Sequence, residues 1–169
     1  MQVHLYIFSF LEAIDLGRMA QVSIYFSRLA GDDEVWAAVT ALNFPSYLPK
    51  ERIEHFTFKC TNVISIPFPI LIIQLIRLSL VDCVEQVDDE FVERVLDFSH
   101  SSLKHLNLSG CSKATQSSFE KFTELCPDMI SLDLSGVSLP SLSEFYESVI
   151  TSCHSLESLH ISSTFTSNP

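Results

Sequence analysis

The chain has 169 residues, of which 47% are hydrophobic, so it suits one globular domain or a small module joined to part of a larger one. Its net charge of −11, with no basic stripe, disfavours binding to nucleic acid or to an anionic membrane surface. Its five cysteines, without a signal peptide, a C-x-x-C pair or a zinc-type Cys/His spacing, favour a reducing compartment, cytoplasmic or nuclear, and predict no metal site.

Two apolar stretches have some features of membrane signals. VHLYIFSFL at residues 3–11 has the length of a signal-peptide core, but no positive segment precedes it and no small-residue cleavage site follows it. ISIPFPILIIQLIRLSLV at residues 64–81 contains two prolines, Gln74 and Arg77, and is short for a spanning helix of about 20 apolar residues. We therefore expect no signal peptide at residues 3–11, buried core at residues 64–81, and no membrane partner.

Residues 1–46 are expected to form a small helical module. In LYIFSFLEAIDLGRMAQVSIYFSRLAGDDEVWAAVTALNF, residues 5–44, Asp15 is a candidate cap for a second helix. The Gly-Asp-Asp sequence at residues 31–33 predicts a turn, and Asp33 and Glu34 favour the start of a further helix that carries Trp36. About 40 residues are too few to bury a good core alone, so the apolar face must pack on the rest of the chain or on a partner.

Residues 47–71 are expected to be a linker or an irregular first repeat. PKERIEHFTFKC resembles the helix of a repeat unit, and Val63, Ile66, Phe68 and Leu71 have a strand-like spacing. Two prolines fit a central strand poorly, so a capping transition is the other interpretation.

A repeat begins at about residue 72 and continues through the C-terminal part of the chain. The pattern Leu-x-x-Leu-x-Leu-x-x-Cys occurs in LIRLSLVDC and LKHLNLSGC, and related forms occur in MISLDLSGV and LESLHIS. The central positions are Leu78, Leu106, Leu132 and Leu159, at intervals of 28, 26 and 27 residues. Four matches at a nearly fixed period predict a repeat architecture over residues 72–169, with about four units.

Each interval between these motifs contains an amphipathic segment. DDEFVERVLDFSHS, SSFEKFTELCPD and SLSEFYESVITSCHS all have apolar residues at helical spacing. Asp88 or Asp89 is expected to cap the first helix, and Ser117 or Ser118 the second. Cys83, Cys111, Cys126 and Cys153 recur at repeat positions, which predicts small buried thiols without disulfide bonds.

The repeat resembles the cysteine-containing class of leucine-rich repeats over about residues 72–164. Short strands that alternate with helices at this period give a parallel sheet backed by helices and curved into a horseshoe. The expected fold class is therefore α/β, with a helical module followed by a short leucine-rich-repeat horseshoe.

Ahead of such repeats, the helical module resembles an F-box. The resemblance rests on IFSFL, then DLGRMAQVS, an aromatic pair and RLAGDDEVW, and it implies docking on the Skp-type adaptor of cullin–RING ubiquitin ligases. Carried over to this chain, the adaptor-facing set comprises Ile7, Leu11, Leu16, Val22, Leu29 and Trp36, some of which will instead pack inside the module. We expect Trp36 and Leu11 to be binding anchors. The Leu-Pro-x-Glu-like segment that usually opens the family's module is absent here, so we expect adaptor binding to be weakened.

The strand residues between the motif leucines should form the concave face and hold a substrate protein. They fall into three columns: Arg77, His105, Ser131 and Ser158; Ser79, Asn107, Asp133 and His160; Val81, Ser109, Ser135 and Ser162. The candidate substrate-binding residues are Arg77, Ser79, His105, Asn107, Asp133 and His160. Solvation alone also explains small polar residues at such positions.

Together the resemblances imply a substrate-recognition subunit of an SCF-type ubiquitin ligase, with an adaptor, a cullin and a substrate protein as partners. The alternative is a ligase-independent leucine-rich-repeat scaffold whose N-terminal helices cap the first repeat. No Ser-His-Asp arrangement and no glycine-rich phosphate loop is present, so we expect neither catalysis nor a cofactor.

Overall fold

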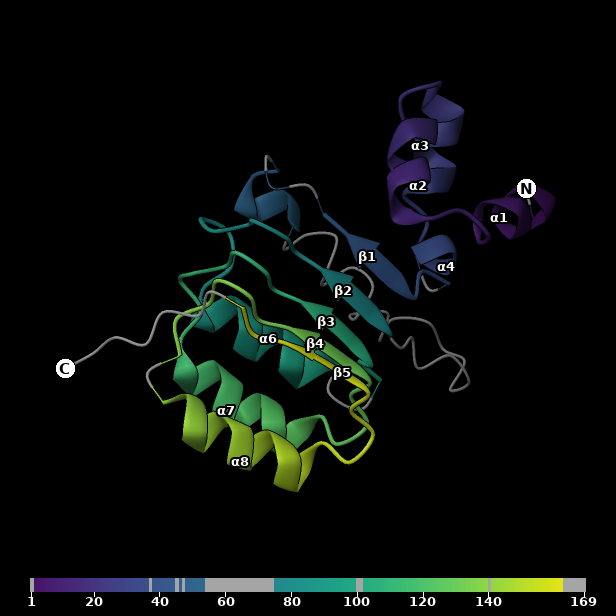
Figure 1. The fold of residues 1–169 in the computed structure, drawn as a ribbon. Helices are drawn as coiled ribbons and strands as arrows, with labels where there is room; N and C mark the ends of the chain where they lie inside the picture. The colour runs from purple at the N-terminus through teal and green to yellow at the C-terminus, as the bar shows by residue number, and fades with distance from the viewer. Residues whose placement is uncertain are drawn as a thin grey trace.

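The computed structural model describes residues 2–36, 38–44, 46, 48–53, 75–99, 102–139 and 141–162. Short helices form the N-terminal part, and a parallel sheet with helices along one face forms the rest (Figure 1). None of the helices in these ranges is long and apolar enough to cross a membrane.

The first four helices are α1 (Gln2–Phe8), α2 (Ala13–Met19), α3 (Ile24–Ala30) and α4 (Asp33–Trp36). The side chain of Ser23 caps α3 by accepting a hydrogen bond from the backbone N–H of Phe26 (3.1 Å). The predicted capping of α2 by Asp15 is wrong, because Asp15 lies inside the first turn and pairs with Arg18. The predicted turn between the third and fourth helices is confirmed, and Gly31 ends α3.

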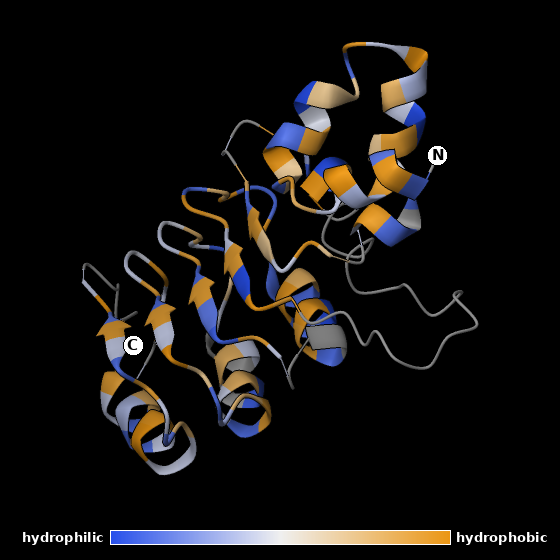
Figure 2. Cartoon of the chain, turned by 90° about the vertical axis from the view of Figure 1, so that its right-hand side faces the viewer, coloured by the Kyte–Doolittle hydropathy of each residue, from blue (hydrophilic) through white to orange (hydrophobic). Residues whose placement is uncertain are grey.

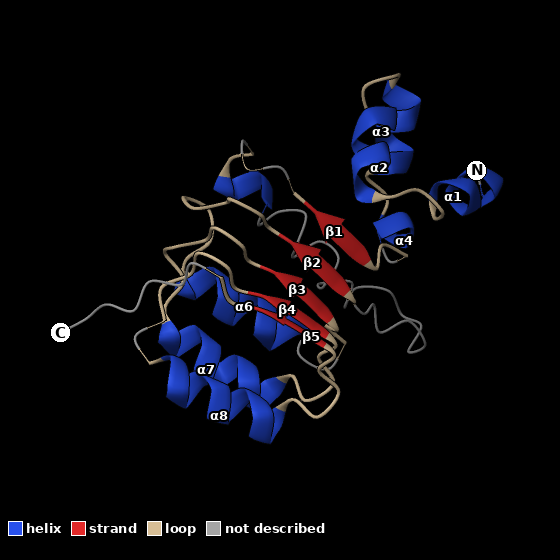
Figure 3. Ribbon diagram, viewed as in Figure 1, coloured by secondary structure: helices blue, strands red, loops and turns tan. Residues whose placement is uncertain are grey.

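The sheet has five parallel strands in the order of the chain: β1 (Ala41–Asn43), β2 (Arg77–Ser79), β3 (His105–Asn107), β4 (Ser131–Asp133) and β5 (Ser158–His160). Parallel neighbours require crossover connections, and those after β2, β3 and β4 contain α6 (Asp89–Ser99), α7 (Gln116–Leu125) and α8 (Leu142–Ser152). These three helices lie side by side along one face of the sheet (Figure 3). The predicted α/β class and the three predicted helices are confirmed.

The strand register is the one that the repeat alignment predicts. Leu78, Leu106, Leu132 and Leu159 are paired in successive strands. The structure adds a fifth member, because Leu42 of β1 pairs with Leu78. The sequence analysis missed β1 and included it in the helical module, although Val39-x-x-Leu42-x-Phe44 repeats the spacing of the later motifs.

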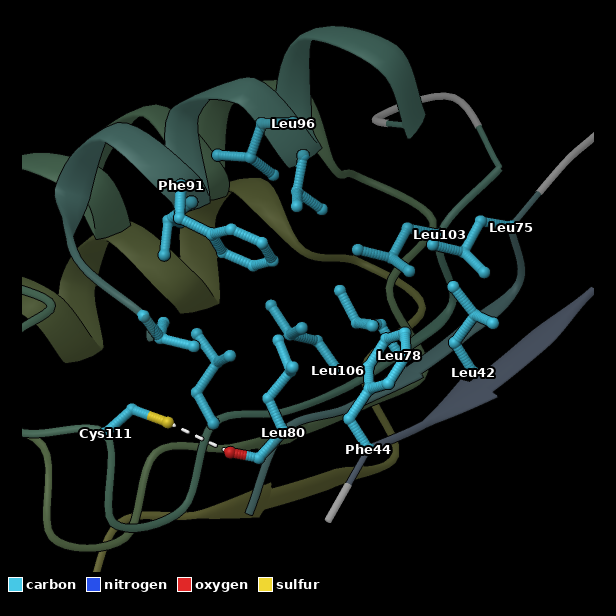
Figure 4. Packing of buried hydrophobic residues seen from close by; sticks show 14 of the residues in the cluster. Leu42, Phe44, Leu75, Leu78, Leu80, Phe91, Leu96, Leu103, Leu106 and Cys111 are labelled. Carbon is cyan, nitrogen blue, oxygen red and sulfur yellow. Dashed lines mark hydrogen bonds between the residues drawn. The ribbon is translucent and has the colours of Figure 1, made fainter. Parts of the chain in front are cut away.

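The core lies between the sheet and the helices. The motif leucines Leu78, Leu80 and Leu106 are buried and face Phe91 and Leu96 of α6 (Figure 4). In the later units, aromatic side chains of α7 and α8 are buried in the same way, namely Phe119, Phe122 and Phe145. Since strand residues alternate between the two faces of a sheet, the leucines point to the helices and their neighbours point to the open face.

The cysteines are part of this core. Cys83, Cys111, Cys126 and Cys153 are buried and free of disulfide bonds, as predicted, whereas Cys60 lies outside the described residues. The Cys111 thiol donates a hydrogen bond to the carbonyl oxygen of Leu80 in the preceding unit (3.0 Å; Figure 4). Burial raises the pKa of Cys111 and of Cys126 to about 12, so both are protonated at neutral pH.

A tight turn follows each of the strands β2, β3 and β4 at an equivalent position. Asp82, Gly110 and Gly136 have positive φ angles of 57°, 80° and 78°. Their N–H groups donate to the carbonyl oxygens of the next unit at 2.7 to 2.9 Å, on Ser109, Ser135 and Ser162. These bonds continue the stacking of the units beyond the short strands.

The helix starts differ in part from the predictions. Asp88 caps α6, as expected for one of the two candidates, by accepting a hydrogen bond from the backbone N–H of Phe91 (3.0 Å). The predicted cap of α7 is wrong: Thr115 is at the N-cap position, and the Ser118 hydroxyl donates instead to Asp89. Most of residues 47–71 lie outside the described residues, so the interpretation of that segment stays a prediction.

Candidate protein-interaction surfaces

An apolar stripe runs along α1 and the residue pair that follows it. Val3, Tyr6, Ile7 and Phe10 have the i, i+3, i+4, i+7 spacing of one helix face, and 52 to 71% of each is exposed. The rings of Tyr6 and Phe10 contact each other edge to face, 4.9 Å apart. A stripe of this kind normally faces a core, so its exposure makes it a candidate interaction surface.

A second group of exposed apolar residues lies on α2, on α3 and on the connection between them. Figure 2 shows apolar residues on the outer sides of the N-terminal helices. Ile24 is 77% exposed, and Tyr25 links α3 to α1, because its hydroxyl lies 2.8 Å from Nδ1 of His4. We call the whole set the N-terminal apolar surface: Val3, Tyr6, Ile7, Phe10, Ile14, Val22, Ile24 and Tyr25.

Burial separates the predicted adaptor-facing residues into two groups. Ile7 and Val22 are exposed, and Leu11 is half-buried against the core. Three members are almost fully buried inside the chain, namely Leu16, Leu29 and Trp36. They are core residues in this structure and are not available to a partner.

Trp36 has a specific internal role. Its side chain is 3% exposed, and its indole Nε1–H donates a hydrogen bond to the carbonyl oxygen of Ala30, the last residue of α3 (2.6 Å). A helix leaves its last carbonyl groups without intrahelical partners, so this bond joins α3 to α4. In this structure Trp36 therefore holds two helices of the module together.

Sequence reasoning missed most of the N-terminal apolar surface. Val3, Tyr6, Phe10, Ile24 and Tyr25 were not among the predicted contacts, although the spacing of the first three was readable in the sequence. Periodicity identifies an apolar helix face but does not say whether that face points inward or outward.

The predicted substrate-binding residues do share one face of the sheet. Arg77 aligns with His105 and Ser131, and Ser79 aligns with Asn107, Asp133 and His160, as the predicted columns require. Arg77 and His160 are exposed, and the other four candidates are half-buried. No described helix covers this open face, which lies opposite α6, α7 and α8 (Figure 1).

Two of these residues, Asn107 and Asp133, also accept hydrogen bonds from the backbone. Oδ1 of Asn107 accepts a hydrogen bond from the N–H of Ser109 (2.9 Å), and Oδ1 of Asp133 accepts one from Ser135 (3.0 Å). Nδ2 of Asn107 lies 3.5 Å from Oδ2 of Asp133. The side chains of Asn107 and Asp133 therefore also bind the backbone just after β3 and β4.

Within the described ranges, no group of three or more His, Cys, Asp and Glu side chains is placed to hold a metal ion. The two candidate surfaces differ in chemistry: exposed apolar side chains lie at the N-terminal end, and polar side chains lie on the open face of the sheet.

Comparison with known proteins identifies the N-terminal part. Residues 2–41 match a family model described as F-box-like, and this range spans α1 to α4 and the first residue of β1. No curated protein matches the chain.

Proposed function

We propose that this chain, with its F-box-like domain at residues 2–41, is a substrate-recognition subunit of an SCF-type ubiquitin ligase. The N-terminal apolar surface docks on a Skp-type adaptor, which connects it to a cullin. The open face of the sheet holds the substrate protein. The protein itself is not an enzyme in this proposal and acts in the cytoplasm or the nucleus.

The observation that carries the adaptor half of the proposal is the exposed stripe on α1. Four apolar side chains at helical spacing are 52 to 71% exposed, while Phe8 of the same helix is 4% exposed. The helix thus has one face toward the chain and a second apolar face toward solvent. An apolar face of this extent on a small module is the feature that a helix-binding partner would cover.

The substrate half rests on the repeat register. We propose that the units around β2 to β5 are leucine-rich repeats arranged as a horseshoe, supported by the regular pairing of the motif leucines and by the crossover helices on one face. Such arrays present an extended surface for another protein because each unit adds the same set of outward side chains.

The test is adaptor binding by the full chain and two matched variants. Ile24→Glu places a charge in the N-terminal apolar surface, and Ile150→Glu places one on α8, at nearly the same exposure of 74%. A charge at an interface centre should cost about 2 kcal/mol or more, or roughly 30-fold in affinity. We expect calorimetry with purified Skp-type adaptor to show this loss for Ile24→Glu alone.

Both variants should keep the circular dichroism spectrum and urea midpoint of the wild type, since both sites are exposed. Absence of adaptor binding by the wild-type chain refutes the ligase proposal. Equal losses from the two substitutions refute the proposed docking surface.

One observation favours the alternative, a ligase-independent scaffold. Helix α2 contacts β1, and buried residues of the module belong to the same core cluster as the leucines of the sheet. The module therefore covers the first strand, as a solenoid cap does. A protein with this role would retain the open face and would not bind the adaptor.

A further inference from the structure

The last described unit of the sheet has an apolar side that the rest of the described chain leaves open. In this unit, formed by α8 and β5, Leu156 and Leu159 are half-buried, whereas the equivalent residues of the earlier units are at most 4% exposed. Strand β5 lies at the edge of the sheet, and within the described part of the chain no helix follows α8 (Figure 1). The last unit therefore lacks the cover that each earlier unit receives from the next.

Helix α8 contributes an apolar stripe to the same side. Tyr146 is 43% exposed and Ile150 is 74% exposed, one turn apart. The Ser148 hydroxyl lies 2.6 Å from the hydroxyl of Thr123 in α7, so Ser148 is on the side of α8 that faces α7. With 3.6 residues per turn, Tyr146 and Ile150 are each about 160° around the helix from Ser148 and face away from α7. We call the whole set the C-terminal apolar surface: Leu142, Tyr146, Ile150, Leu156 and Leu159.

In the earlier units, the corresponding side of each helix is covered by the next helix. Helix α7 packs along α6, and α8 packs along α7. The position two residues after the first phenylalanine of each helix is Glu93, Lys121 and Glu147 in turn, at the same intervals of 28 and 26 residues as the first three motif leucines. Nζ of Lys121 pairs with Oε1 of Glu93 at 2.8 Å. A helix that packs on α8 as α7 packs on α6 would therefore place a cation beside Glu147.

The charge of the last unit also favours a basic occupant. Residues 141–162 contain Glu144, Glu147 and Glu157, all exposed, and no lysine or arginine. A second copy of this chain, packed about a two-fold axis, would bring the same acids together, with a net charge of −11 on each copy. Lysine and arginine residues on another molecule are complementary to these glutamates.

We propose that the C-terminal apolar surface binds a basic amphipathic helix of a partner protein. The apolar side of that helix packs on Tyr146 and Ile150, and its lysine or arginine residues pair with Glu147. This surface lies at the β5 end of the sheet, and the N-terminal apolar surface lies beyond β1 at the other end. The proposal therefore goes beyond the proposed ligase function and does not depend on it.

The experiment uses the full chain and three fluorescently labelled peptides of about 18 residues, long enough to form a helix. The first peptide has leucines along one side of the helix and lysines and arginines beside them. The second has glutamate in place of every basic residue. The third has the composition of the first in an order that spreads the leucines around the helix. We expect anisotropy titrations to show binding of the first peptide, and roughly tenfold weaker binding or none for the other two.

Ile150→Glu tests the apolar contact. A charge at the centre of the interface should weaken binding of the first peptide by roughly tenfold or more, although it makes the chain more acidic. Ile24→Glu is the matched control, because it adds the same charge at a similarly exposed site in the N-terminal apolar surface, and it should leave this affinity unchanged. Both sites are exposed, so both variants should keep the wild-type circular dichroism spectrum.

Glu147→Gln tests the charge complementarity. Loss of one exposed ion pair should weaken binding of the first peptide by roughly two- to fivefold. Glu90→Gln removes the same charge from another exposed glutamate, on α6, and should leave the affinity unchanged.

The proposal is overturned if the second or third peptide binds as tightly as the first, or if Ile150→Glu and Ile24→Glu weaken binding equally. Sedimentation equilibrium of the wild-type chain alone tests for the other occupant. A dimer that Ile150→Glu dissociates would assign the surface to a second copy and would also overturn the proposal. A chain that binds the first peptide but not the adaptor refutes the ligase proposal and leaves the C-terminal apolar surface as a binding site.

Discussion

Substitution of Trp36 tests whether its side chain is a binding anchor for the adaptor or a core residue of the module. The side chain is 3% exposed and donates a 2.6 Å hydrogen bond to the carbonyl oxygen of Ala30. Trp36→Ala removes a buried aromatic side chain and should cost about 3–5 kcal/mol, a large part of a total stability of about 5–15 kcal/mol. Trp36→Phe keeps most of the ring but leaves the carbonyl group unpaired, at a cost of about 1–3 kcal/mol.

The informative variant is therefore Trp36→Phe, because it should remain folded. Urea unfolding followed by far-ultraviolet circular dichroism measures its stability without relying on tryptophan fluorescence, which the substitution removes. Calorimetry with the Skp-type adaptor measures its affinity. We expect a lower urea midpoint and an unchanged dissociation constant, whereas Ile24→Glu should show the reverse.

The opposite result would show that the reasoning from burial is wrong. If Trp36→Phe keeps the wild-type urea midpoint and loses about tenfold or more in affinity, the indole contacts the adaptor. The module would then have to rearrange on binding, since in this structure the ring is inside the chain.

Three further predictions concern the repeats and the module. Gly110→Ala should destabilise the protein by roughly 1–3 kcal/mol, because φ is +80° and an added Cβ would collide with the Asp82 carboxylate. Gly17→Ala, with open space around it, should stabilise α2 by roughly 0.5–1 kcal/mol. Equal effects of the two substitutions on the free energy of unfolding, measured by urea titration, would contradict both predictions. Burial raises the pKa of Asp89, but hydrogen bonds from groups around the start of α7 outweigh it and hold the pKa below its ordinary value of 3.8. The stability from Asp89 is therefore complete above pH 3.8 and is lost as the pH falls through the folded-state pKa, so Asp89→Asn should flatten the loss of stability in acid, and an unchanged pH profile would count against this role. Because burial raises the pKa of Cys111 to about 12, its thiol should react with alkylating reagents only after unfolding, and mass spectrometry that finds it in a disulfide would refute the buried-thiol assignment.

The repeat region was the more predictable part of the fold. A parallel sheet built from equivalent units repeats its buried positions at nearly constant intervals, so four weak motifs reinforce one another. The pairing of Leu78 with Leu106, and of Leu106 with Leu132, follows from that alignment alone. The open-face columns follow as well, because strand residues alternate between faces.

Strand β1 was missed for a definite reason. It repeats the spacing of the later motifs through Val39, Leu42 and Phe44, but a longer interval separates it from β2, so it falls outside the regular period. It also follows directly on the helices of the module. A single match of three apolar positions carries little information without its neighbours.

The sequence could not predict which apolar residues of the module are buried and which are exposed, for a different reason. Both Ile7 and Leu16 are apolar residues at helical spacing, yet one is 52% exposed and the other fully buried. In a module this small the helices have apolar residues on more than one side, and only the packing decides which side is covered. The exposed side is also the side that a partner would bury, so it is apolar like the core. Amino-acid composition alone therefore does not distinguish surface residues of the module from core residues.

The join between the module and the sheet bears directly on the proposed ligase. Leu16, Val39 and Leu42 belong to one continuous buried cluster, which extends through Leu78 into the repeats. Close-packed interiors transmit displacement because they contain little free volume. In the proposed function, a substrate on the open face would therefore be held at a fixed orientation to the adaptor bound at the N-terminal apolar surface. A flexible linker between the module and the sheet would permit many orientations of the substrate relative to the adaptor. The continuous core, together with the pairing of β1 with β2, removes this freedom.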